Sequence, residues 1–144
     1  MAHYPSKILV ASDGSDASAL AMRHAAELAG TIGTELHLVV VGLISQWTHP
    51  DTLSSSQFER IQQETRDRLE IEKGKLVEAG ASEVHGHARV GKVDGEIVRL
   101  AEELDAGLIV IGNRGMGSLQ RMLLGSDAES VVRHAPCAVM VIRA

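Results

Sequence analysis

Short apolar runs alternate along this chain with longer segments that have the hydrophobic spacing of an amphipathic helix. The expected strands are 7–12, 35–42, 82–90, 108–111 and 138–143. The expected helices are one that opens at Ser15 and ends near Gly33, two that span 57–79 and 93–104, and a short one that begins near Ser126. Runs that are apolar at successive positions are typical of strands buried on both faces. The pattern therefore predicts right-handed crossovers and an α/β three-layer sandwich around a mostly parallel five-stranded sheet.

The carboxyl ends of the expected strands carry the first candidate binding residues. In an open parallel sheet, ligands bind beyond these ends, at the point where the strand order reverses. Asp13, Val41 and Gly112 each stand at such an end. Asp13 has an alternative role, because an Asp-Gly pair commonly stabilises a turn or caps a helix. The side chain of Val41 also fits a strand core residue.

A glycine-rich segment follows the fourth expected strand and leads into the last expected helix. It contains Gly112, Gly115 and Gly117, and then Gly125 and Ser126. Backbone N–H groups in such a turn, next to a helix N-terminus, can bind phosphate. No lysine follows the glycines as it does in a P-loop. Main-chain N–H groups and a hydroxyl would therefore hold the phosphates, and the alternative is a long surface turn with positive-φ positions.

Two residues of this region have roles that need no ligand. Ser126 and Glu129 have the spacing of a capping box, in which each side chain satisfies a free N–H group at the helix start. A capping serine leaves other N–H groups of the first turn free, so capping and phosphate binding can coexist. Arg114 is either a solvated loop charge or a counter-charge to phosphate.

Three parts of the chain resemble the universal stress protein family. The spacing Gly112-x2-Gly115-x9-Gly125-Ser126 resembles its ATP-binding signature, 7–15 resembles its first strand and turn, and 134–142 resembles its final turn and strand. The resemblance thus covers nearly the whole chain. It implies the strand order 3-2-1-4-5 and a Rossmann-like fold of the adenine-nucleotide alpha-hydrolase-like type.

The resemblance also implies a ligand and a set of site residues. The implied ligand is ATP, with Mg or Mn as an accompanying ion near Asp13, and adenine contacts the main chain at Val41. The implied nucleotide-binding residues are Ser12, Asp13, Val41, Ile111, Gly112, Arg114, Gly115, Met116, Gly117, Gly125, Ser126 and Asp127. The family commonly has an uncharged residue where this chain has Asp127. That carboxylate suits a helix N-terminus, but it would repel a triphosphate there.

Composition excludes several classes of partner and location. A chain of 144 residues suits a single domain, 1–144. Its formal net charge of −5 and its aromatic content of 2% disfavour nucleic acid and anionic membranes as partners. One cysteine, Cys137, fits a reducing compartment. No apolar run reaches the length of about 20 residues that a transmembrane helix needs. The cytoplasm is therefore the expected location.

Motifs for catalysis and for a resident metal are weak. The chain has no Gly-x-Ser-x-Gly elbow and no His-Glu-x-x-His sequence, which are common signatures of hydrolases and metalloproteases. His85 and His87 would lie on one face of a strand, a spacing that can chelate a metal ion. No third ligand stands at a conventional sequence spacing from them, so the sequence predicts no specific metal site.

Three functions follow in order of preference. The first is an ATP-binding regulatory protein of the stress response. The second is the same fold with weak or no nucleotide binding, acting as a dimeric protein-interaction module. The third is a slow ATPase that would use bound water and a divalent ion. The resemblance, and the apolar character of an expected edge strand, predict a homodimer through the final strand, Ala138 to Arg143, because such an edge invites pairing.

Overall fold

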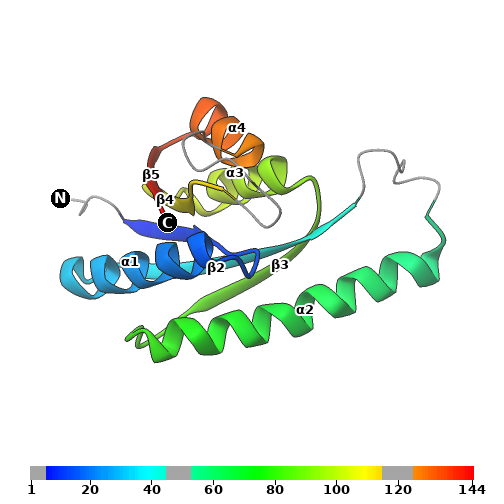
Figure 1. Ribbon diagram of the computed structural model, residues 1–144, viewed down its shortest axis with the longest axis horizontal. Helices are drawn as coiled ribbons and strands as arrows, with labels where there is room; N and C mark the ends of the chain where they lie inside the picture. Colours follow the sequence, from blue (N-terminus) through cyan, green and yellow to red (C-terminus); the bar gives the residue numbers. More distant parts are fainter. Residues whose placement is uncertain (1–5, 45–52, 115–124) are drawn as a thin grey trace.

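The computed structural model describes residues 6–44, 53–114 and 125–144. Its strands are β1 (Lys7–Ala11), β2 (Glu35–Leu43), β3 (His85–Gly91), β4 (Leu108–Gly112) and β5 (Ala138–Ile142). Its helices are α1 (Asp16–Ile32), α2 (Ser55–Glu78), α3 (Val93–Leu104) and α4 (Ser126–His134). The strands pair in parallel in the order β3-β2-β1-β4-β5 (Figure 1). The predicted α/β fold and strand order are confirmed.

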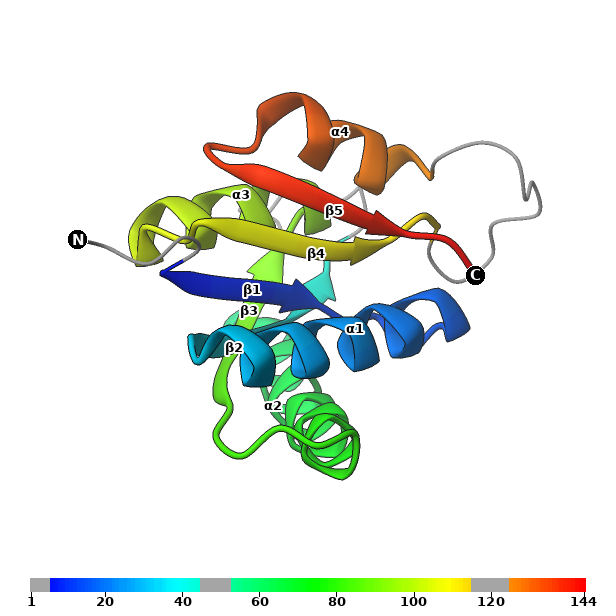
Figure 2. The same ribbon diagram turned by 90° about the vertical axis from the view of Figure 1, so that its left-hand side faces the viewer.

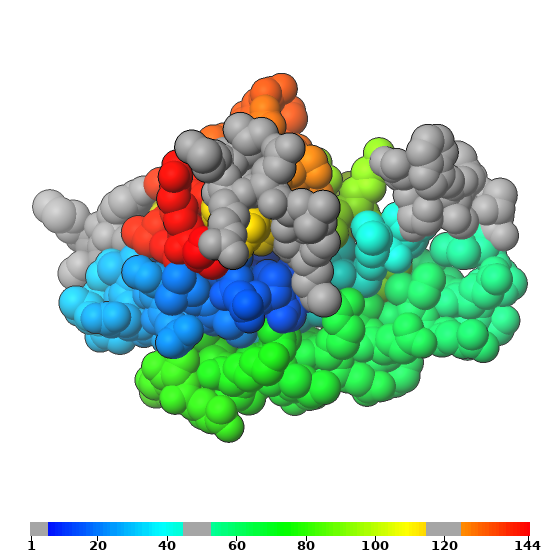
Figure 3. All heavy atoms as spheres, viewed as in Figure 1, coloured from blue at the N-terminus to red at the C-terminus, as the bar shows by residue number. Residues whose placement is uncertain are grey.

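The helices cover both faces of the sheet and enclose two apolar cores. Alternating residues of β1 serve different cores: Ile8 and Val10 pack with α1 and α2, whereas Leu9 packs with α3 and α4. In Figure 2, α1 and α2 lie on one side of the strands and α4 on the other. The space-filling view shows the atoms of α1 and α2 side by side (Figure 3). Each fully buried Leu, Ile or Val side chain contributes about 1.5–3 kcal/mol.

The ends of α1 have the predicted chemistry. The Ser15 side chain caps the helix by accepting a hydrogen bond from the Ser18 N–H group at 3.2 Å. Gly33 ends the helix in the left-handed conformation with φ 77°, which a residue without Cβ adopts easily. The Ser15 cap sets where α1 begins after β1, and Gly33 sets where α1 ends before β2.

Helix α2 begins earlier than the sequence predicts. The sequence predicts a helix over 57–79, but Ser54 and Gln57 form a capping box and the helix starts at Ser55. Gly74 does not interrupt it. Phe58 is 37% exposed, whereas Leu69 and Leu76 are buried. The capping box at Ser54 therefore starts the helix among serines, which have a low helix propensity.

The strand boundaries shift by a few residues. β2 continues to Leu43, β4 includes Gly112, and β3 begins at His85 rather than at Ser82. A Cβ atom at Gly42 would collide with the Thr65 side chain, so this glycine lets α2 lie close to β2. Of the helices that the structure describes, none has the length and apolar character needed to cross a membrane.

Candidate nucleotide-binding site

A cavity of about 370 Å³ opens at the carboxyl ends of the strands. β1 lies between β2 and β4, so the strand order reverses at this point. The cavity is lined by Ser12, Asp13, Val41, Ile111, Gly112, Arg114, Gly125, Ser126 and Asp127. These are all of the predicted site residues within the described ranges. Gly115, Met116 and Gly117 lie outside the described residues.

The turn after β1 forms one side of the cavity. The Ser12 N–H group donates to the Val39 carbonyl oxygen at 3.1 Å, which extends the pairing with β2 by one residue. Asp13 Oδ1 accepts a hydrogen bond from the Ser15 N–H group at 2.9 Å, the Asx turn that the Asp-Gly pair predicts. Gly14 follows with φ 84°. Asp13 therefore has a structural role in the turn and still lines the cavity.

Hydroxyl groups behind this turn connect it to α2. Ser12, 5% exposed, donates to the Glu72 carboxylate at 2.5 Å and lies 3.2 Å from the Ser18 hydroxyl. Glu72 is itself buried and pairs with Lys75 at 2.7 Å. Buried polar groups are stable only when they are hydrogen-bonded, so this network holds Ser12 in one orientation.

Gly112 allows α1 and β4 to approach each other closely. A Cβ atom at this position would lie 2.8 Å from the carbonyl carbon and from the Cβ atom of Ala17. The glycine therefore sets the distance between the first turn of α1 and the end of β4. Its role in the fold is as direct as its role in the cavity wall.

Helix α4 begins at Ser126, and its N-cap is Gly125. Ser126 is thus the first helical residue, and the capping box expected with Glu129 is absent because the N-cap position has no side chain to accept a hydrogen bond. The Gly125 N–H group donates to the Asn113 carbonyl oxygen at 2.7 Å, which joins the two ends of the glycine-rich segment. Within the described part of the chain, no side chain caps the N–H groups of the first turn, and such groups bind anions.

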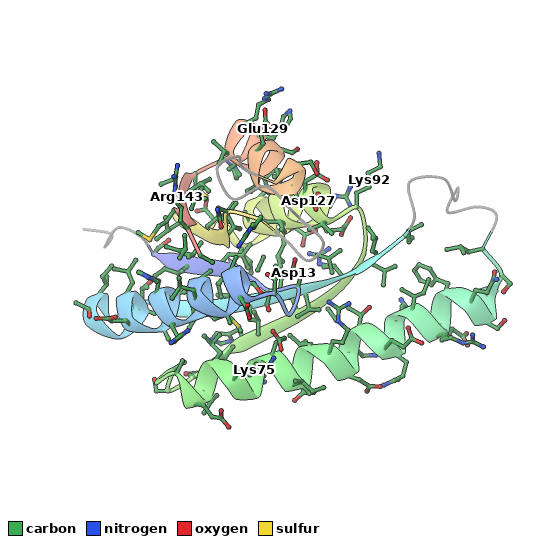
Figure 4. All side chains as sticks on the ribbon, viewed as in Figure 1. Asp13, Lys75, Lys92, Asp127, Glu129 and Arg143 are labelled. Atoms are coloured by element: carbon green, nitrogen blue, oxygen red, sulfur yellow. The ribbon has the colours of Figure 1, made fainter. Side chains whose placement is uncertain are left out.

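Carboxylates make the polar part of the cavity electronegative. Burial raises the pKa of the Asp127 carboxyl above its usual range, and the charges of Asp94 and Asp13 raise it further. Figure 4 shows Asp13 after β1 and Asp127 at the start of α4.

The cavity wall also contains residues that the sequence did not single out. The apolar ones are Ala11, Val39, Val93, Ile97, Ala128 and Val131, and the polar one is Ser18. Val93 and Ile97 are one helical turn apart on the amphipathic stripe of α3, which predicted core residues but not a cavity. Arg114, which also lines the cavity, is a basic side chain among these groups.

Comparisons of the sequence and of the fold with known proteins both find universal stress proteins. The family model described as the universal stress protein family matches residues 5–143. The chain is 39% identical over 126 residues to universal stress protein G of Shigella flexneri, which covers 85% of this chain and 87% of that protein.

Two solved structures extend the likeness to three dimensions. The universal stress protein UspA from Lactobacillus plantarum has a TM-score of 0.80 at 28% identity, covering 96% of this chain and 97% of that one. The universal stress protein from Archaeoglobus fulgidus in complex with dAMP has a TM-score of 0.70 at 27% identity, covering 99% of this chain and 100% of that one. The similarity therefore extends over almost the entire chain.

Proposed function

Since the chain belongs to the universal stress protein family, we propose that it binds ATP as a regulatory ligand in a cytoplasmic stress response. The ligand site is the cavity beyond the carboxyl ends of β1, β2 and β4. The dAMP complex of the Archaeoglobus fulgidus protein supports an adenine nucleotide as the class of ligand.

One observation carries the proposal: an apolar wall and an uncapped helix start face the same cavity. Val39, Val41 and Ile97 supply apolar contacts suited to a purine base. The N–H groups at the start of α4 supply donors suited to phosphate. The volume of this cavity, about 370 Å³, is large enough for a small molecule, since such sites begin at roughly 300 Å³.

The accompanying ion is the second part of the proposal. Asp13 and Asp127 line the cavity into which the phosphates would bring further negative charge. A divalent ion, Mg²⁺ or Mn²⁺, supplies charge compensation for phosphates when bound. We assign Asp13 to this ion, and Arg114 and Ser126 to the phosphates together with the glycine-rich segment that contains Gly115, Met116 and Gly117.

A second candidate function is favoured by the charge of the same region. The carboxyl groups of Asp13 and Asp127 both line the cavity, so an approaching polyphosphate meets groups of like sign. A pocket of this kind would bind nucleotide weakly, in which case the protein acts through partner contacts. Slow ATP hydrolysis is the third candidate, for which a bound ion and water would be sufficient.

We also propose a homodimer formed through β5. This strand pairs with β4 on one side and stands at the edge of the sheet, where free backbone groups can pair with a second copy. Its Met140 side chain is 37% exposed. Two-fold antiparallel pairing near 139–142 would cover both the free backbone groups of β5 and the Met140 side chain. Sedimentation that finds only monomer at roughly 10–100 μM contradicts it, since an interface of standard size should hold there.

Two measurements on the purified protein test ATP binding. Native mass spectrometry should find a nucleotide that purifies with the protein, and calorimetry should find one ATP bound per chain. Adenosine should bind more weakly than ATP if the start of α4 contacts phosphate. If no nucleotide purifies with the protein and calorimetry detects no heat of ATP binding, the partner-binding function is favoured. Release of phosphate from ATP at a steady rate would favour the ATPase function.

A further inference from the structure

A cluster of metal-ligating side chains lies at the opposite end of the sheet from the nucleotide cavity. Glu35 and His37 stand near the start of β2, and His85 and His87 at the start of β3. The parallel register pairs His37 with His85 and Val39 with His87. Strand pairing thus brings together three imidazoles and one carboxylate that are far apart in the sequence.

The distances within this cluster are short. His37 Nε2 lies 3.2 Å and His85 Nε2 lies 3.7 Å from the same carboxylate oxygen, Glu35 Oε1. The rings of His37 and His85 stack with their centroids 4.6 Å apart. One ligand atom from each of the three residues lies within 4.8 Å of the others. Three donor atoms therefore already surround one small volume.

We propose that Glu35, His37 and His85 form a binding site for a divalent first-row transition-metal ion such as Zn²⁺. Nitrogen and carboxylate ligands lie about 2.0–2.2 Å from Zn²⁺, so two ligand atoms of one tetrahedral ion are about 3.4 Å apart. The ligand atoms of the cluster lie within 4.8 Å of one another, so they need to approach by at most about 1.4 Å to reach this geometry. The side chains of Glu35 and His85 are 52% and 40% exposed, which leaves them free to rotate.

His87 has a positioning role in this site. His37 Nδ1 lies 2.9 Å from His87 Nε2. A histidine that binds a metal through one nitrogen almost always donates a hydrogen bond from the other. When His37 Nδ1–H donates to His87, the lone pair of His37 Nε2 is directed toward Glu35 and His85.

The surrounding charges are mixed. The carboxylate of Glu83 lies 3.6 Å from His85 Nε2 and adds negative charge beside the site. Lys7 and Arg89 add positive charge near His37 and His87 respectively. Three neutral or anionic ligands with an open fourth position match the 2-His-1-carboxylate set of Zn²⁺ and Fe²⁺ sites. A bound ion would join the edge strand β3 to β2.

Calorimetric titration of the nucleotide-free protein with ZnCl₂ tests the proposal. The parent chain should bind one Zn²⁺. Glu35→Gln and His85→Ala should each weaken binding at least about tenfold, since even groups that only orient a ligand are worth that much. His87→Ala should weaken it by about 10–100-fold, the usual effect of such an orienting partner. Co²⁺ should give a visible absorption band in the parent that is lost in His85→Ala.

The controls separate a built site from adventitious binding. His24→Ala removes an exposed imidazole from α1 and should leave Zn²⁺ affinity unchanged. Circular dichroism checks that each variant is folded, and both principal variants alter partly exposed side chains. No stoichiometric binding in the parent, or equal affinity in Glu35→Gln and His85→Ala to that of the parent, overturns the proposal. ATP binding by His85→Ala should equal that of the parent, so the two sites are tested independently.

Discussion

The two ends of the sheet are built for binding in different ways. At the carboxyl end, glycines and apolar side chains surround a cavity, and the polar groups include main-chain N–H groups at the start of α4. At the amino end, the donors are the side chains of Glu35, His37 and His85. One end depends on backbone shape and the other on side-chain chemistry. Substitutions should therefore act through space and conformation at the first end and through ligand identity at the second.

The largest expected effect is at the carboxyl end, in Gly112→Ala. The added Cβ atom would lie 2.8 Å from the carbonyl carbon of Ala17. Overpacking of this kind costs about 1–3 kcal/mol, and urea denaturation should show that loss in the free energy of unfolding. The matched control is Gly30→Ala in α1, because an added Cβ atom there meets none of the described atoms within 4 Å outside the helix's own backbone. This substitution should stabilise the helix, since alanine has a higher helix propensity than glycine. Equal stability of both variants would mean that Gly112 does not set this close approach.

The second prediction tests whether Gly125 is needed for its lack of a side chain or for its backbone conformation. Gly125 has φ −63° and ψ 156°, which any residue can adopt, but a Cβ would lie 3.2 Å from Arg114 Cα. Gly125→Val should therefore weaken ATP binding at least tenfold, about 1.4 kcal/mol, with little change in melting temperature. Calorimetry and thermal unfolding measure the two quantities. Unchanged affinity would reduce the glycine-rich segment to a simple turn.

The third effect concerns charge in the cavity. Asp127→Asn removes a carboxylate whose pKa is raised by burial and by Asp94 and Asp13, so it should tighten ATP binding by about threefold to tenfold. The gain should be larger at low salt and without Mg²⁺. Glu129→Gln removes the same charge from the first turn of α4, at a residue that pairs with Arg133, and should change affinity less. Equal gains in affinity in both variants would mean that the net charge near α4, and not the position of Asp127 in the cavity, determines the effect.

The smallest effect is a pH-dependent stability term beside the cavity. The Ser130 hydroxyl donates to Asp94 at 2.6 Å and holds the pKa of that carboxyl below its usual range. A lowered folded-state pKa contributes stability above the unfolded pKa and loses it as the pH falls through the folded pKa. Ser130→Ala should thus cost roughly a few tenths of a kcal/mol at neutral pH, after solvent screening, and less in acid. In an Asp94→Asn background, this pH dependence should vanish.

Local patterns predicted the strand ends at the carboxyl end, and the family resemblance supplied the strand order that places those ends beside one cavity. Apolar runs followed by Asp13, Val41 or Gly112 mark strand ends, and parallel strands bring their carboxyl ends to one edge. The structure describes α3 from Val93 to Leu104, as the period of apolar residues predicts. The cap of α4 was predicted wrongly, because Gly125 and Ser126 are both acceptable N-caps and the hydrogen bond to Asn113 selects the glycine.

The amino end could not be predicted in the same way. His85 and His87 were recognised as a pair that can chelate, but the third imidazole comes from β2 through strand register. Register between β2 and β3 depends on how both strands pack against their helices, and no short sequence spacing encodes it. Besides the pair His85 and His87, the other local signal is His37, a histidine inside an apolar run. An imidazole that is only 5% exposed needs polar partners.

The difference between the two ends can be measured in a single titration of ¹⁵N-labelled protein with ATP, followed by amide chemical shifts. The account predicts large shifts at Ser12, Asp13, Val41 and at the start of α4, and none at His37 or His85. Gly125→Val should suppress the shifts across the cavity while its spectrum remains that of a folded protein. Shifts that are absent at the start of α4, or that gather at the β2–β3 edge, would contradict the assignment of the nucleotide site.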